Sequence, residues 1–266
     1  TGLRPLLEES GNPDVAVVDP PRAGLSKKVV RRLIECEARR IVYVSERDAV
    51  PHVFLYTFTT SRETQLTNGA VGDAAPRVSP DGKSVACVRD GKDLRVLDLA
   101  AKTERSLATG FLSRTDRGVA WSPDSRWVAY LGLSARSFRN VHAVPAAGGE
   151  SRAVSALPNG NANNISWSPD DTYVLYNTSQ RTEEGQIVRM DLVLRTPKFR
   201  EDRFRDLFKE GEPARAGRGG AAPDRDAEPA RDPSKPVEIV FDDIRQRLSL
   251  LPVGVDVAAQ TISPDG

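Results

Sequence analysis

The side chains best suited to acid–base or nucleophilic chemistry are few and scattered along the sequence. Among 266 residues there are two histidines, His52 and His142, and two cysteines, Cys36 and Cys87. Each histidine stands alone in a stretch patterned like a β-strand, whereas a catalytic base works within hydrogen-bonding reach of its partner. The sequence also lacks a Gly-x-Ser-x-Gly elbow, a His-Glu-x-x-His pair and a phosphate-binding glycine loop. We therefore predict no catalytic residues, no metal ligands and no bound cofactor.

A short proline-rich loop near the start of the chain has a more specific pattern. It lies between a predicted buried strand and a predicted helix, for which Ser26 is a suitable N-cap. A second predicted strand follows the helix, so this region has the order of one βαβ unit, the building block of parallel sheets. The strand, loop, helix and second strand are predicted at Asp14–Asp19, Pro20–Leu25, Ser26–Arg39 and Ile41–Ser45.

The loop Asp19-Pro20-Pro21-Arg22 and the strand Arg40–Ser45 resemble the uracil-5 RNA methyltransferases. In that family a Tyr-Val-Ser strand leads into a cysteine that attacks C6 of uracil, and S-adenosylmethionine supplies the methyl group. Glu46 stands at the position of that cysteine, and a carboxylate cannot form the thioether adduct. The family's cofactor loop lies further upstream than this chain reaches. The resemblance thus implies a methyltransferase-like fragment over residues 1–45 whose loop binds no cofactor, made up of Asp19, Pro20, Pro21 and Arg22.

The tripeptide Ser-Pro-Asp occurs four times and indicates the architecture of the remaining chain. The first three copies are about 45 residues apart and the last follows after about two such periods, which is typical of one propeller blade per repeat. Serine first, proline with its preset φ second and aspartate third suit a type I turn. We predict these structural turns at Ser79-Pro80-Asp81, Ser122-Pro123-Asp124, Ser168-Pro169-Asp170 and Ser263-Pro264-Asp265.

Alternating apolar runs after each turn predict paired strands, and the first full repeat contains four of them. Four strands per period is the count of a propeller blade. The predicted fold class is therefore mainly β, an incomplete β-propeller of four-stranded blades preceded by a short βαβ fragment. Trp121, Trp127 and Trp167 are predicted to fill the core between blades. The strands are predicted at Ser84–Val88, Leu94–Leu99, Glu104–Ala108, Trp127–Tyr130 and Tyr173–Tyr176.

From Tyr43 onward the sequence resembles the propellers of the TolB protein and of tricorn-like serine peptidases. Tyr43–Asp48, Pro51–Tyr56 and Thr64–Gly69 read as the second, third and fourth strands of a first blade. In the peptidase family such propellers precede a PDZ module and a catalytic core. The stretches that favour the peptidases are Phe138–Val141, Pro145–Glu150, Arg195–Asp202 and Phe241–Leu248.

The resemblance implies a noncatalytic propeller part of a tricorn-like serine peptidase that binds or guides peptides. One alternative is a TolB-like protein–protein interaction propeller, and another is the remnant of a SAM-dependent RNA uracil-5 methyltransferase. Peptides or proteins are the expected partners. A net charge of +1 argues against nucleic acid, and no apolar run is long enough for a membrane span. The two unpaired cysteines leave a periplasmic and a cytoplasmic location open.

The domain organisation predicted from these patterns has two parts. Residues 1–45 form the βαβ fragment, expected to lie outside the toroid, and residues 46–266 form the propeller region. Ile41–Ser45 suits both families, so the junction is either a true fusion or a joined reading frame. We predict a short amphipathic helix at Lys198–Lys209 and a mobile low-complexity insertion at 210–235. An unclosed array exposes strand edges, so self-association is expected.

Overall fold

The computed structural model describes residues 15–18, 38–47, 49–112, 118–133, 136, 138–157, 161–179, 184–194, 236, 238–253, 255–257 and 259–262. Several sequence predictions fall outside these residues. They are the loop Asp19-Pro20-Pro21-Arg22, the helix from Ser26 except its last two residues, the helix Lys198–Lys209, the insertion 210–235 and the turn Ser263-Pro264-Asp265.

The described residues form four sheets, which we call blades 1 to 4 in chain order. Blade 1 contains β1 (Val15–Val18), β2 (Arg40–Arg47), β3 (Val50–Thr57) and β4 (Arg62–Gln65), with the 3-10 helix η1 at Phe58–Thr60. Blade 2 contains β5 (Asp73–Val78), β6 (Ser84–Arg89), β7 (Asp93–Asp98) and β8 (Glu104–Thr109).

Blade 3 contains β10 (Val119–Trp121), β11 (Trp127–Leu133), β12 (Arg139–Pro145) and β13 (Arg152–Ala153), and β9 (Phe111–Leu112) also pairs with β11. Blade 4 contains β14 (Ala162–Trp167), β15 (Tyr173–Thr178), β16 (Gln186–Asp191) and β17 (Leu248–Leu251), with the 3-10 helix η3 at Ile244–Arg247. The predicted mainly β fold of four-stranded blades is confirmed. A strand was predicted at Thr64–Gly69, whereas the corresponding strand β4 begins at Arg62 and ends at Gln65.

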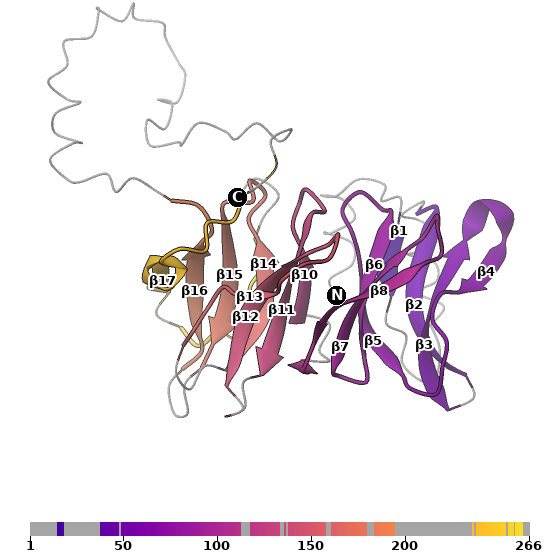
Figure 1. Cartoon of the computed structure of the whole chain (residues 1–266), viewed down its shortest axis with the longest axis horizontal. Helices are drawn as coiled ribbons and strands as arrows, with labels where there is room; N and C mark the ends of the chain where they lie inside the picture. Colours follow the sequence, from indigo (N-terminus) through magenta and orange to yellow (C-terminus); the bar gives the residue numbers. More distant parts are fainter. Residues whose placement is uncertain are drawn as a thin grey trace, which may run out of the picture.

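The blades stand side by side in chain order, from blade 1 at the right to blade 4 at the left (Figure 1). An apolar cluster lies between each pair of neighbours, because alternate residues of a strand face opposite sides of its sheet. Val85 and Cys87 of β6 face blade 1, while Ala86 and Val88 face blade 3. The buried residues between blades 3 and 4 include Leu131, Val141, Ile165, Trp167, Val174, Tyr176, Val188 and Met190.

The inner strand of blade 1 has the opposite orientation to those of the other blades. β1 pairs in parallel with β2, with Val15 opposite Arg40 and Val18 opposite Tyr43. β5, β10 and β14 each pair antiparallel with the next strand. The expectation that residues 1–45 lie outside the toroid is therefore wrong for β1. The apolar strand satisfies main-chain groups at the edge of β2 that would otherwise lack partners.

The three described Ser-Pro-Asp turns share one hydrogen bond. The serine carbonyl oxygen accepts a hydrogen bond from the N–H three residues later, at 2.8 Å from Gly82, 2.9 Å from Ser125 and 2.9 Å from Asp171. All three donors have left-handed backbone conformations, with φ of 68°, 61° and 61°. Glycine adopts this conformation without strain, so Ser125 and Asp171 carry a conformational cost that Gly82 avoids.

The segment 238–247, which precedes β17, packs onto blades 3 and 4. Val240 N–H donates to the Leu192 carbonyl at 2.9 Å, and Ile244 is buried. The centroid of the Phe241 ring lies 6.0 Å from that of the Trp127 ring and 4.1 Å from the guanidinium carbon of Arg152. These contacts hold blade 4 against blade 3. No helix in the described ranges is both long enough and apolar enough to cross a membrane.

Three residues after β17, Asp256, Val257 and Gln260, form hydrogen bonds with blade 4 and with Gly185, directly before β16. Val257 N–H donates to the Gly185 carbonyl at 3.0 Å, and the Asn177 side-chain amide donates to the Val257 carbonyl at 3.3 Å. Asn164 and Gln260 exchange side-chain to main-chain hydrogen bonds, with Gln260 Nε2 3.1 Å from the Asn164 oxygen. These hydrogen bonds hold Val257 and Gln260 against blade 4.

Candidate functional site

The Ser-Pro-Asp residues form a hydrogen-bond relay that holds each hairpin together. Ser122 Oγ accepts the Trp127 N–H at 2.9 Å and donates to Asp124 Oδ1 at 2.6 Å, and Asp124 Oδ1 accepts the Arg126 N–H at 3.0 Å. Ser79 and Asp81 repeat the arrangement with the N–H groups of Ser84 and Lys83. In blade 4, Ser168 accepts from Tyr173 and Asp170 accepts from Thr172. The serine and aspartate of each motif thus supply side-chain acceptors for main-chain N–H groups of their own hairpin.

Two of the predicted core tryptophans link neighbouring blades by hydrogen bonds as well as by packing. The Trp121 indole N–H donates to the Arg77 carbonyl of blade 2 at 3.0 Å. The Trp167 indole N–H donates to the Ala120 carbonyl of blade 3 at 3.3 Å. Both acceptors occupy the same place in their blades, two residues before the turn serine, and both indoles are buried. Trp127 is half-buried against the cluster between blades 3 and 4.

The two histidines lie in different blades and do not come together. His52 is on β3 of blade 1 and His142 on β12 of blade 3, with blade 2 between them. His142 stacks on Tyr130 with ring centroids 5.4 Å apart, and burial lowers its pKa below the usual value. A Cβ on Gly132 would lie 3.0 Å from His142 Cδ2, so glycine there makes room for the imidazole. The arrangement indicates a core histidine.

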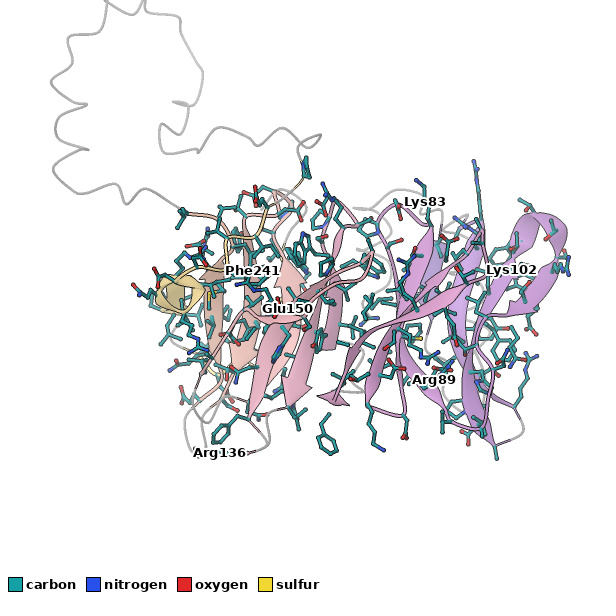
Figure 2. The ribbon with its side chains drawn as sticks, in the orientation of Figure 1. Lys83, Arg89, Lys102, Arg136, Glu150 and Phe241 are labelled. Atoms are coloured by element: carbon teal, nitrogen blue, oxygen red, sulfur yellow. The ribbon has the colours of Figure 1, made fainter. Side chains whose placement is uncertain are left out.

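A cluster of ionisable side chains lies between blades 1 and 2, centred on the fully buried Asp73 at the start of β5. Arg89 Nε donates to Asp73 Oδ1 at 2.9 Å, and the Cys87 sulfur lies 4.0 Å from the same oxygen. His52 Nδ1 lies 3.5 Å from Asp73 Oδ2. Arg89 also donates to both oxygens of Glu104 at 3.2 Å. Figure 2 shows Arg89 toward the lower end of blade 2 and Lys83, beside the Ser79 turn, at its upper end.

This Asp73 cluster has a cysteine, an aspartate and a histidine, yet it lacks the properties of a catalytic triad. Burial and the neighbouring Asp73 charge raise the pKa of the Cys87 thiol, so the thiolate nucleophile is strongly disfavoured. Cys87 is also fully buried. The cluster instead joins blades 1 and 2. Sequence reasoning missed it because its members come from four strands, β3, β5, β6 and β8, and the one signal was a charged residue at the first position of an inner strand.

Among the described residues, no group of three or more histidine, cysteine, aspartate or glutamate side chains is placed to hold a metal ion. Glu46, at the position of the methyltransferase nucleophile, is exposed on β2 opposite Pro51.

One strand edge stands out for its apolar character. β17 is the outer strand of blade 4 and pairs with β16 on one side. Leu250 on β17 is 54% exposed, and the nearby Val253 and Val255 are 44% and 63% exposed. Large apolar side chains are usually shielded in a folded protein, and a group of exposed ones often marks an interaction site.

Comparison with protein families gives one match that covers most of the described blades. The TolB beta propeller domain family matches residues 31–206. Among curated proteins, dipeptidyl-peptidase 5 of Porphyromonas gingivalis is 34% identical over 88 residues, 30% of this chain and 13% of that protein. An uncharacterized RNA methyltransferase of Enterococcus faecalis is 59% identical over 44 residues, 16% of this chain and 10% of that protein. The chain thus spans about a tenth of the length of these relatives.

Solved structures with similar folds include TolB from Acinetobacter baumannii, at 19% identity and a TM-score of 0.46, covering 59% of this chain and 39% of that one. TolB from Agrobacterium tumefaciens has 24% identity and a TM-score of 0.41, covering 51% of this chain and 48% of that one. Dipeptidyl peptidase 4 from Porphyromonas gingivalis has 15% identity and a TM-score of 0.43, covering 53% of this chain and 27% of that one.

Proposed function

The chain belongs to the TolB beta propeller domain family, and from that premise we propose that it is the noncatalytic propeller part of a tricorn-like serine peptidase. In this role it binds peptides or guides them toward a catalytic module. The observation that carries the peptidase assignment is the 34% identity to dipeptidyl-peptidase 5 over 88 residues. Blades with well-packed interfaces leave loops, faces and strand edges for recognition, which suits binding of extended peptides.

Equilibrium binding of peptides tests this proposal. The whole chain is titrated into fluorescein-labelled tryptic peptides of casein, and fluorescence anisotropy follows the bound fraction. We expect saturable binding with a dissociation constant of about 10 μM to 1 mM, the range of weak and transient contacts. Absence of saturation at millimolar chain concentrations would rule out the peptide-binding role.

A protein–protein interaction propeller is the second candidate, and the family match to TolB propellers favours it. A surface specific for a folded partner presents a fixed three-dimensional patch and does not recognise short extended peptides. The casein titration therefore separates the two candidates, since this alternative expects no saturable peptide binding.

An RNA uracil-5 methyltransferase remnant is the third candidate, favoured by the 44-residue match to the Enterococcus faecalis protein. The carboxylate of Glu46 in place of the nucleophile argues against methyl transfer. Transfer of a radiolabelled methyl group from S-adenosylmethionine to a uracil-containing RNA by the purified chain would restore this candidate.

Self-association of the chain is also proposed. The free faces of blades 1 and 4 lie at opposite ends of the row in Figure 1, and unpaired sheet edges promote association. Sedimentation velocity at increasing concentration is expected to show species larger than a monomer. A single monomeric species across the concentration range would contradict this part of the proposal.

A further inference from the structure

We propose that the outer edge of β17 binds an extended, uncharged apolar peptide segment, which adds to blade 4 as a further strand. The inference rests on the proposed function and assigns the peptide-binding role to one edge of the molecule. The peptide would bind through main-chain hydrogen bonds to β17 and would carry apolar side chains at alternate positions.

The main chain of β17 is paired on one side only, within the described chain. Its four residues pair antiparallel with β16, Leu248 opposite Met190 and Leu251 opposite Ile187. On the other side no strand of the described chain pairs with it, and Figure 1 shows β17 at the outer end of the row of blades. A strand edge presents alternating N–H and C=O groups, which an added peptide strand can satisfy.

The side chains of β17 distinguish its edge from those of the other blades. Outer strands of soluble proteins commonly carry charges that discourage pairing with foreign strands. β4, β8 and β13 follow this rule, whereas β17 reads Leu-Ser-Leu-Leu with no charge. The charged residues of the other outer strands are Arg62, Glu63, Glu104, Arg105 and Arg152.

Exposed apolar side chains around this edge set the chemistry of the peptide. Leu250 is 54% exposed and lies opposite the fully buried Val188, so it extends an apolar face outward. Val253 and Val255 come after Pro252 in the chain and are also exposed. Side chains of an added strand project alternately to the two faces. Every second residue of the peptide would therefore lie on the same face as Leu250, which favours apolar residues there.

The strand is held in place before any peptide arrives. The guanidinium group of Arg247, directly before β17, donates to the main-chain carbonyls of Asp191, Val240 and Asp242. Ile244 of η3 is buried in the cluster between blades 3 and 4. A pre-ordered edge lowers the entropy lost on binding, because only the peptide has to be immobilised.

The size of the edge favours a peptide over a second copy of the chain. Four residues span about 13 Å of strand, and Pro252 follows immediately. Proline has no N–H, so it cannot donate to an added strand. A stable dimer needs about 1,000 Å² or more of buried surface, which this short edge alone does not provide. Weak, reversible pairing with a single extended segment is what the edge can support.

The test uses the whole chain and a defined probe, fluorescein-labelled Val-Thr-Val-Thr-Val with blocked ends. A matched probe carries N-methyl groups on both threonines, which removes main-chain donors while leaving the side chains in place. We expect saturable binding of the first probe and at least tenfold weaker binding of the second. Leu250→Lys should weaken binding of the first probe at least tenfold, while Phe111→Lys, at a 67% exposed position on β9, should leave it unchanged.

The outcomes separate this inference from the proposed function. If casein peptides bind but neither N-methylation nor Leu250→Lys matters, the β17 edge is refuted and the peptide-binding role stands. If neither casein peptides nor either probe binds, both proposals fail. If Leu250→Lys abolishes self-association and the probe does not bind, a second copy is the occupant and the peptide assignment is overturned. Thermal melting of both variants, expected to match the parent chain, confirms that they fold.

Discussion

Ser122 offers a sharp test of the relay that holds the blade hairpins together. Its side chain is fully buried, and its hydroxyl accepts the Trp127 N–H while donating to Asp124. Ser122→Ala leaves a main-chain N–H without this acceptor in a place where water does not reach. An unsatisfied buried donor costs about 1–3 kcal/mol, so we expect a loss of about 2 kcal/mol in the free energy of unfolding.

Asp124→Ala should cost less, about 1 kcal/mol, because the Arg126 N–H that it releases lies near the surface and can bond to water. The double variant should cost less than the sum of the two single ones, by about 0.5–1 kcal/mol, since both single changes break the same Ser122–Asp124 hydrogen bond. Both substitutions remove hydrogen bonds from the hairpin that β10 and β11 form.

Urea unfolding followed by tryptophan fluorescence measures these differences, using transition midpoints at equal slope. Ser249→Ala, at an exposed position on β17, is the matched control and is expected to change stability by less than about 0.5 kcal/mol. The reasoning is refuted if Ser122→Ala is as mild as this control, or if Asp124→Ala proves the more damaging change.

Three further predictions concern the charge cluster, the backbone and pH. Asp73→Asn should lower the free energy of unfolding in urea by about 3 kcal/mol, because it leaves Arg89 without its buried partner. The control Asp90→Asn, in an exposed pair with Lys92, should lower it by less than about 1 kcal/mol. Equal losses would contradict a stabilising role for the buried Asp73–Arg89 pair. Lys102→Gly should stabilise the folded chain by about 0.5–1 kcal/mol, because Lys102 has a φ of 54°, which glycine adopts without strain. Thermal melting should show a higher transition temperature for this variant and no increase for the control Lys83→Gly. Because burial lowers the pKa of His142, the unfolded state binds more protons below the usual value of 6.5, so stability should fall as pH drops from 6.5 through the folded pKa. The difference in urea midpoint between the parent chain and His142→Gln should change as pH falls through that window and be constant above it, where the imidazole is neutral in both states, and a pH-independent difference throughout would refute the assignment.

The blades could be predicted because their cause is local. Each Ser-Pro-Asp copy encodes its own turn through a hydroxyl, a proline ring and a carboxylate within a few residues. The following strand alternates in the same short stretch, so β6, β11 and β15 begin at their predicted residues. The buried indoles of Trp121 and Trp167 followed from the same repeat.

Features that depend on contacts distant in the sequence could not be predicted. Nothing local in Val15–Val18 shows that it would take the inner place of blade 1, parallel to β2. The Asp73 cluster likewise joins residues from β3, β5 and β6 that are far apart in the chain. Exposure of Leu250 depends on which side of blade 4 remains open, and the sequence of β17 alone reads as an ordinary buried strand.

Equilibrium dialysis against peptides followed by mass spectrometry tests the binding of uncleaved peptide. The chain is placed on one side of a membrane that only peptides cross, tryptic peptides of casein are added, and the peptides on both sides are weighed at equilibrium. We expect peptides of unchanged mass to be enriched on the side of the chain, since it binds or guides them without cleaving them. Shortened peptides that accumulate with time would contradict the noncatalytic role, and equal peptide concentrations on both sides at millimolar chain concentration would contradict binding.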